Sequence, residues 1–156
     1  MTDRLRDLYQ QIILDHNRSP RNRGRLEHAN RHAEGSNPLC GDKMSLELKV
    51  DDGIITDVRF EGSGCAISQA SASLMTSAVK GKSVAEAEAL FRAFRSMVTA
   101  PATAPIDKDV LGKLAAFGGV RQFPARVKCA NLSWHTLHAA LGETDDPVTT
   151  EQEGAG

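Results

Sequence analysis

The chain has 156 residues, of which 40% are apolar and 25% charged, and 19 Lys and Arg against 20 Asp and Glu give a formal net charge of -1. A chain of this length suits one domain of about 100 to 200 residues and is long enough to bury a core. The nearly neutral charge argues against a nucleic-acid-binding protein, because such proteins usually carry a strongly basic surface.

The sequence also does not show the patterns of membrane insertion or export. No apolar run approaches the roughly 18 residues of a membrane span. The N-terminal segment, MTDRLRDLYQQ, alternates charged and apolar side chains and does not form the apolar centre of a secretory signal. We therefore expect a cytoplasmic protein that binds neither membrane nor nucleic acid.

The first predicted element is a helix over 3–16, because apolar residues recur there at spacings of three and four. The segment 17–38 is rich in Asn, Gly, Pro and Arg, which is typical of a loop, with a short edge strand near 31–36.

Two runs of alternating apolar and polar residues, 44–50 and 54–60, then predict an antiparallel hairpin that turns at 51–53. This register places Met44 opposite Phe60. In the second run Ile54, Val58 and Phe60 are expected on one face, and Thr56 interrupts the alternation.

Helices are expected over the remainder of the domain. A helix of small side chains covers 65–79, and Ser83 with Glu86 forms a capping-box signature that opens the next helix. A short helix follows from Asp107 to about Phe117, and a last one covers 126–141. The predicted fold class is therefore α+β, with a small antiparallel sheet of two to three strands covered on one face by about five helices. Residues 1–142 form one domain, and 143–156 form an acidic, disordered tail.

The sequence contains three cysteines, Cys40, Cys65 and Cys129. In a reducing cytoplasm disulfides rarely persist, so thiol chemistry or metal binding is expected. The two strands of the hairpin place Cys40 and Cys65 at the same end of the sheet. If the last helix docks with its N-terminus at that end, Cys129 completes a cluster of three sulfur atoms.

Three thiolates suit a soft or borderline cation such as Zn²⁺, whose fourth ligand could be Asp42, a histidine or a substrate. Nearby Arg126 and Lys128 could offset the negative charge of such a site. The cysteines are separated by 24 and 63 residues, which matches no standard zinc finger. A purely structural zinc site, or cysteines that pack as small apolar residues, therefore stay open.

Three motifs resemble those of the IscU/NifU N-terminal superfamily of iron–sulfur cluster assembly proteins: NPLCGD at 37–42, GSGCAISQAS at 62–71 and RVKCA at 126–130. The resemblance extends over 5–141. Lys128 stands where IscU-type scaffolds carry His, and the stretch between Leu90 and Val120 is longer than theirs; both features resemble the SufU branch.

This resemblance implies an IscU/SufE-like fold and a zinc site made of Cys40, Asp42, Cys65 and Cys129. It also implies a sulfurtransferase that accepts persulfide sulfur from a SufS-type cysteine desulfurase and passes it to downstream iron–sulfur assembly machinery. Cys40, in a glycine-containing loop, is the expected acceptor, and Arg126 would guide the partner or hold Asp42.

Two other functions use the same ligands. The protein could be a scaffold that assembles and donates a [2Fe–2S] cluster, although such clusters prefer thiolate or histidine ligands to the aspartate available here. It could also be a metal adaptor that binds the desulfurase without accepting sulfur.

The histidines are expected to have structural roles. His135 and His138 lie three residues apart on the last helix, beside apolar neighbours, which favours packing over metal ligation. His16 ends the first helix, where a cation interacts favourably with the helix dipole.

The loop after the first helix is locally basic through five arginines, Arg18, Arg21, Arg23, Arg25 and Arg31. Such a run is either a solvated face or a docking patch for an acidic surface of the desulfurase.

Overall fold

The computed structural model describes residues 3–38, 41–142 and 148–149. The elements are α1 (Asp3–Arg18), β1 (Arg31–Asn37), β2 (Asp42–Asp51), β3 (Ile54–Ser63), α2 (Ala66–Val79), α3 (Val84–Thr99), α4 (Lys108–Leu111), the 3-10 helix η1 (Gly112–Gln122), α5 (Pro124–Leu141) and β4 (Val148–Thr149). The rest of the tail predicted over 143–156 lies outside the described residues.

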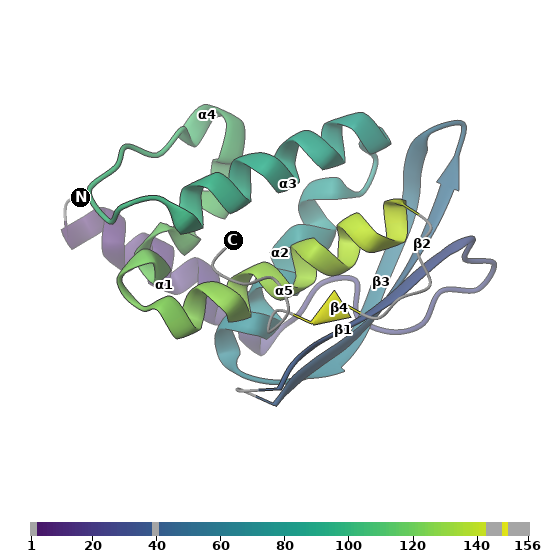
Figure 1. Cartoon of the computed structure of the whole chain (residues 1–156), viewed down its shortest axis with the longest axis horizontal. Helices are drawn as coiled ribbons and strands as arrows, with labels where there is room; N and C mark the ends of the chain where they lie inside the picture. The colour runs from purple at the N-terminus through teal and green to yellow at the C-terminus, as the bar shows by residue number, and fades with distance from the viewer. Residues whose placement is uncertain (1–2, 39–40, 143–147, 150–156) are drawn as a thin grey trace.

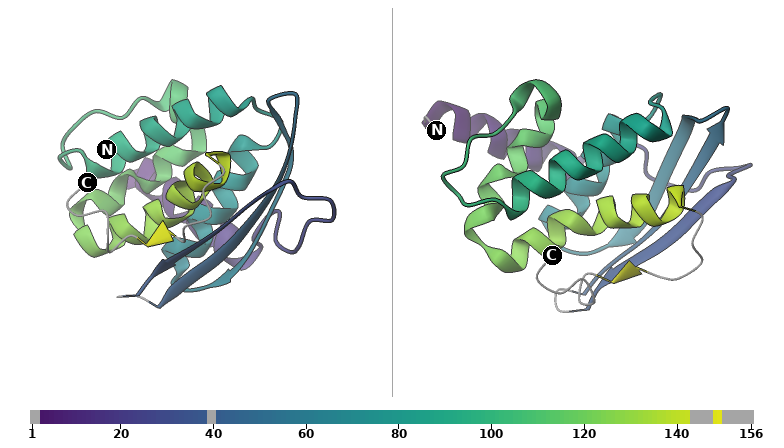
Figure 2. Two further views of the ribbon diagram at one scale, coloured as in Figure 1. Left: turned by 45° about the vertical axis from the view of Figure 1, so that its right-hand side comes forward. Right: turned by 45° about the horizontal axis from the view of Figure 1, so that its top comes forward.

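The sheet has the strand order β3-β2-β1-β4. Strands β1, β2 and β3 are antiparallel, which confirms the predicted small antiparallel sheet, and the two residues of β4 add a parallel pairing to β1. The helices lie on one face of this sheet, and no helix of the described residues covers its other face (Figures 1 and 2). The predicted α+β architecture is therefore confirmed.

Helices α2 and α5 contact the sheet directly, while α1 packs against α2 and α3 packs against α5. Helix α2 is buried from Ser68 to Thr76, because its small side chains let neighbouring backbones approach closely. The Ser71 hydroxyl donates to the Ala130 carbonyl at 2.6 Å, which ties α2 to α5. On the far side of α5, Phe94 stacks on Trp134 with ring centroids 5.1 Å apart.

The hairpin register differs from the predicted one. Leu46 lies opposite Phe60, and Met44 lies opposite Gly62. The turn consists of only Asp52 and Gly53, whose φ angles of 52° and 76° are both positive, as a two-residue hairpin turn of the favoured type requires. The prediction that Met44 faces Phe60 is therefore wrong.

A β-bulge at Thr56 explains a second difference. Lys49 pairs with Asp57 and Val50 pairs with Ile55, so Thr56 is the extra residue of β3. Because the bulge reverses the alternation, Ile55 is fully buried while Ile54 is 39% exposed. The prediction that Ile54 faces the helices is wrong, and Ile55 takes its place.

The outer edge of β3 is in contact with two loops. Near the middle of the strand, Phe60 exchanges backbone hydrogen bonds with Asn22 and Gly24, at 3.0 and 2.9 Å. Beyond the bulge, the Ile55 amide donates to the Lys82 carbonyl at 2.8 Å, and the Gly81 amide donates to the Ile55 carbonyl at 2.7 Å.

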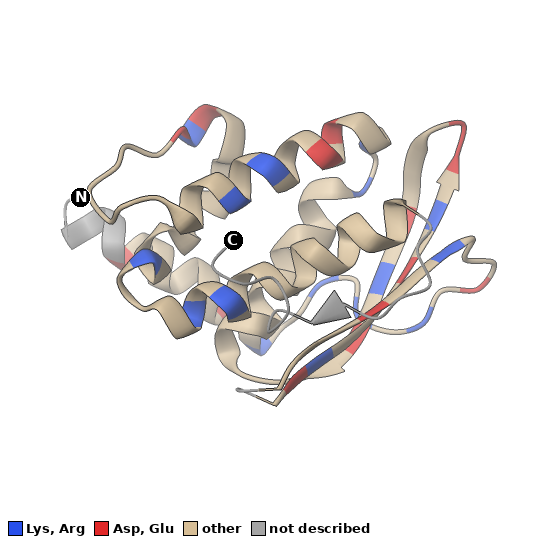
Figure 3. Cartoon of the chain, in the orientation of Figure 1, with Lys and Arg blue, Asp and Glu red and all other residues tan. Residues whose placement is uncertain are grey.

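The capping box at Ser83 and Glu86 is confirmed. The short helix predicted from Asp107 is not continuous: α4 ends at Leu111, and Gly112, with φ +54°, starts the 3-10 segment η1. Within the described residues, no helix is long and apolar enough to cross a membrane. Lys and Arg are interspersed with Asp and Glu along the strands (Figure 3), in line with the near-zero net charge.

Candidate metal and thiol site

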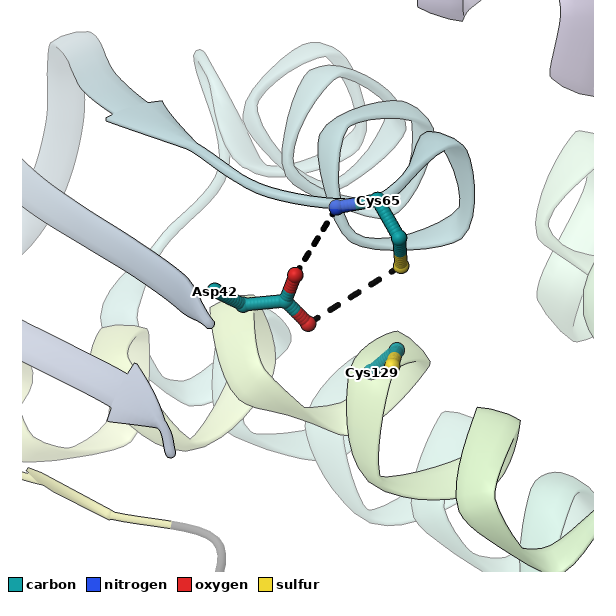
Figure 4. Close-up of side chains that lie close together, drawn as sticks. All are labelled: Asp42, Cys65 and Cys129. Carbon is teal, nitrogen blue, oxygen red and sulfur yellow. Dashed lines mark hydrogen bonds between the residues drawn. The ribbon is translucent and has the colours of Figure 1, made fainter. Parts of the chain in front are cut away.

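Three predicted site residues meet at one end of the sheet. Asp42 starts β2, Cys65 immediately precedes α2, and Cys129 lies in the second turn of α5 (Figure 4). One ligand atom from each residue lies within 4.8 Å of the others. Asp42 and Cys129 are fully buried, and Cys65 is partly exposed.

The hairpin brings Asp42 and Cys65 together. Because Lys43 pairs with Ser63, the chain that leaves β3 passes beside the start of β2. The Cys65 amide then donates to Asp42 Oδ1 at 2.8 Å, and Cys65 Sγ lies 3.9 Å from Asp42 Oδ2 (Figure 4). Gly64 makes this approach possible, since a Cβ at that position would lie 2.3 Å from Asp42 Oδ1.

Cys65 caps helix α2, because its Sγ accepts a hydrogen bond from the Ser68 amide at 3.4 Å. Hydrogen bonding with the Cys129 thiol lowers the pKa of the Cys65 thiol to about 6, and the Ser68 amide acts in the same direction. Burial and the Asp42 carboxylate oppose this lowering of the pKa. The contacts with Cys129 and Ser68 therefore favour the thiolate form of Cys65, which is the form that binds a metal ion.

Cys129 is positioned by the sheet as well as by its own helix. Its Sγ lies 3.6 Å from Nδ2 of Asn37, the last residue of β1, and 3.6 Å from the carbonyl oxygen of Ala125. The N-terminal half of α5 thus docks at the end of the sheet where the hairpin places Asp42 and Cys65, which is the docking that the cluster expected from the sequence requires.

For two of the predicted site residues, Cys40 and Arg126, the predicted contacts stay predictions. Cys40 lies outside the described residues, so its position among the ligands stays a prediction; Pro38 and Gly41 on either side are described, and the Gly41 amide donates to the Pro38 carbonyl at 3.4 Å. Arg126 is exposed in the first turn of α5, three residues before Cys129. Its contact with Asp42 likewise stays a prediction.

The histidines take structural positions. His138 stacks on Phe91 with centroids 4.8 Å apart and pairs with Glu88 at 2.8 Å, and His135 meets the edge of the same Phe91 ring. His16 lies in the last turn of α1, but its ring is buried, with Nδ1 2.7 Å from Ser73 Oγ. Burial lowers the pKa of His16, so the residue contributes packing more than charge.

Arginines of the predicted basic loop anchor the loop to the rest of the chain. Arg21 pairs with Asp15, and Arg23 donates to the Gly62 carbonyl at 3.0 Å. Arg25 lies 3.5 Å from Glu47. These contacts give the arginines a structural role that the sequence pattern did not reveal.

The donor set suits zinc. Two sulfur atoms and one carboxylate oxygen lie within 4.8 Å of one another, and thiolate sulfur and carboxylate oxygen are both ligands that zinc takes in proteins. Within the described residues, Asp42, Cys65 and Cys129 form the one such group of potential ligands, and the histidines stand apart from it.

The chain is similar to known proteins in both sequence and structure. The family model of the NifU-like N-terminal domain matches residues 8–130. The chain is 42% identical to the zinc-dependent sulfurtransferase SufU of Bacillus subtilis over 139 residues, which are 88% of this chain and 92% of that protein.

Scaffold proteins are also similar to this chain. It is 41% identical to the iron–sulfur cluster assembly scaffold protein IscU of Streptococcus pyogenes over 138 residues, 88% of this chain and 85% of that one. A crystal structure from Fervidobacterium islandicum, described as a scaffold protein for the SUF system, superimposes with a TM-score of 0.78 at 38% identity, covering 84% of this chain and 94% of the other.

Proposed function

We propose that this chain, which belongs to the NifU-like N-terminal domain family, is a zinc-dependent sulfur-transfer protein of iron–sulfur cluster biogenesis. The observation that carries this proposal is the convergence of a carboxylate and two thiols at one end of the sheet. The similarity to SufU of Bacillus subtilis supports zinc and sulfur transfer in particular.

Cys40, Asp42, Cys65 and Cys129 would hold the metal ion. Bound zinc keeps cysteine ligands in the thiolate form and protects them from adventitious oxidation. Asp42 would supply an oxygen ligand, which is less well matched to zinc than a fourth thiolate and therefore makes the site more labile.

Cys40 is the proposed acceptor of sulfur. Cys129 is fully buried and out of reach of a second protein, and Cys65 is held by hydrogen bonds at both its amide and its sulfur. Cys40 belongs to the short connection between β1 and β2, only two residues before Asp42.

The transfer step balances without an added oxidant or reductant. The Cys40 thiolate attacks the terminal sulfur of a persulfide on a SufS-type cysteine desulfurase. A new sulfur–sulfur bond forms at Cys40, the donor's sulfur–sulfur bond breaks, and the donor cysteine leaves as a thiolate. The persulfide on Cys40 then passes to downstream assembly machinery.

Arg126 would guide the donor to this site. Its side chain is exposed in the first turn of α5, and residues three apart on a helix share a face, so Arg126 lies on the same side of α5 as Cys129. A cation there attracts an anionic persulfide and acidic groups around it. Arg126→Gln is expected to slow transfer at low salt while zinc stays bound.

The proposal is tested on protein purified without reconstitution. Elemental analysis is expected to find one zinc per chain, and the protein should be colourless. After incubation with a SufS-type desulfurase and cysteine, peptide mass spectrometry should find one added sulfur atom on Cys40.

A scaffold function is the second candidate, because relatives of similar identity are named IscU scaffold proteins. Brown protein that contains iron and acid-labile sulfide would favour the scaffold over transfer. Bound zinc without added sulfur on Cys40 would instead indicate a metal adaptor that binds the desulfurase without accepting sulfur.

A further inference from the structure

Asn37 lies at the thiol site and has no role in the function proposed above. It is the last residue of β1, and its side chain is only 1% exposed. Its Nδ2 donates to Cys129 Sγ at 3.6 Å, whereas its Oδ1 has no hydrogen-bond partner in the described part of the chain.

The fold alone gives little reason for asparagine at this position. Asparagine is disfavoured in strands, and a buried carbonyl without a partner destabilises the folded state. A valine would suit the strand and has no polar side-chain atom that needs a partner. What asparagine supplies at this point is an amide N–H directed at the sulfur of Cys129.

Asn37 and Asp42 form one row of the sheet. They are paired residues of β1 and β2, and both side chains are buried on the face covered by the helices. Asp42 holds Cys65, and Asn37 contacts Cys129. One pair of strand residues thus contacts both cysteines, of which one precedes α2 and the other lies in α5.

Two of the contacts of Cys129 Sγ, with the Ala125 carbonyl and with the Asn37 amide, differ in kind. The Ala125 carbonyl is an acceptor and can partner only the protonated thiol, whereas the Asn37 amide can also partner the thiolate that a metal ion requires. A hydrogen bond to a ligand sulfur fixes its direction and reduces its negative charge.

We infer that Asn37 is a positioning residue of the thiol site, whose amide holds Cys129 beside Cys65 and Asp42 and so sets how tightly zinc is retained. This inference rests on the proposed function, because it takes zinc as the bound ion. Partners of this kind typically change metal affinity by about 10- to 100-fold.

Asn37→Val tests the inference, with Asn131→Ala as the matched control. Asn131 is also a buried asparagine, whose Oδ1 has no hydrogen-bond partner among the described residues, and it lies on α5 two residues after Cys129, where the helix turns it away from that sulfur. Zinc affinity is measured by competition with a chromophoric chelator, and stability is measured by urea unfolding of the metal-free proteins.

Asn37→Val is expected to lose about tenfold in zinc affinity while the metal-free protein is at least as stable as the wild type. In the Co²⁺-loaded protein the sulfur-to-cobalt charge-transfer band should move to lower energy, since the sulfur loses a hydrogen bond. Asn131→Ala is expected to lose stability and to keep the wild-type affinity and band.

A wild-type zinc affinity and an unchanged cobalt band in Asn37→Val would overturn the inference and leave Asn37 a packing residue. A wild-type protein that binds no zinc would overturn the proposed function, and the inference with it. If Asn37→Val does not fold, Asn37→Ser, whose shorter hydroxyl does not reach the sulfur, is measured in the same way and has the same expected loss.

Discussion

Asp42 and Cys65 are 23 residues apart in the chain, yet Oδ1 of Asp42 accepts a hydrogen bond of 2.8 Å from the Cys65 amide. This bond fixes the start of β2 to the first residue before α2. It also occupies only one carboxylate oxygen, so Oδ2 is directed towards the Cys65 sulfur, 3.9 Å away (Figure 4). The Oδ1 atom thus has a structural role, and Oδ2 faces the place where the proposed metal ion would bind.

Variants of Asp42 separate these two roles. Asp42→Asn keeps an acceptor for the Cys65 amide and removes the charge, so it should fold with nearly wild-type stability and bind zinc more weakly. Asp42→Ala leaves a buried amide without its partner and should lose about 1–3 kcal/mol of unfolding free energy. Urea unfolding of the metal-free proteins checks this difference, and equal losses in both variants would contradict it.

Cys40→Ala should separate sulfur transfer from metal binding. We expect the variant to keep part of its zinc, because three ligands are still present, and to lose its stimulation of the desulfurase. The measurement is alanine production by the desulfurase with and without the variant, beside elemental analysis of the same sample. Full stimulation would exclude Cys40 as the acceptor.

Cys129→Ala should raise the pKa of Cys65, because alanine removes the side-chain donor that serine would keep. Hydrogen bonding with Cys129 is the largest cause that lowers this pKa to about 6, so its removal should move the pKa back towards the usual value of 9.0. The check is the pH dependence of iodoacetamide labelling of the metal-free proteins, followed at the Cys65 peptide by mass spectrometry. An unchanged midpoint would mean that the Ser68 amide suffices.

His16 should make the protein less stable in mild acid. Burial lowers its folded-state pKa below the ordinary value of 6.5, so between these two pKa values the unfolded chain binds a proton that the folded chain does not. This contribution to stability is complete above 6.5 and is lost as the pH falls towards the folded-state pKa. In urea unfolding at a series of pH values, His16→Gln should show a smaller loss over that interval than the wild type.

Gly64→Ala should disrupt the site, and Gly53→Ala is its control. Both glycines have positive φ, +153° and +76°, but only at Gly64 would a Cβ clash with Asp42; at Gly53 no atom lies within 4 Å. Both variants should lose about 1–3 kcal/mol from backbone strain. Gly64→Ala should lose more, and zinc binding should fall in that variant alone.

Much of the fold and the site could be predicted from the sequence, because the predictions depend only on where the strands and helices begin and end. Alternation of apolar residues gives a hairpin, and any hairpin here places Asp42 near Cys65. The predicted register was in error by two residues, yet both side chains still meet at the sheet end.

Other features depend on contacts that a single sequence does not display. In the sequence, the bulge at Thr56 is visible as a break in the alternation of apolar and polar residues. Whether Ile54 or Ile55 is then buried depends on the length of the turn, which the alternation does not give. The end of α4 at Gly112 could be predicted only with knowledge of the positive φ of that residue. The burial of His16 could be predicted only with knowledge of its contact with Ser73 on α2. Asn37 carried one usable signal, since asparagine at the end of a buried strand is unfavourable without a specific partner.

The loops along the outer edge of β3 also affect how separate molecules behave. An unpaired strand edge is a template on which a second chain can add by backbone hydrogen bonding, which leads to aggregation. Here Phe60 and Ile55 already use their edge-facing groups for the segments 22–24 and 81–82. Mutations that loosen either loop should therefore favour intermolecular association through β3, even where the thiol centre is left intact.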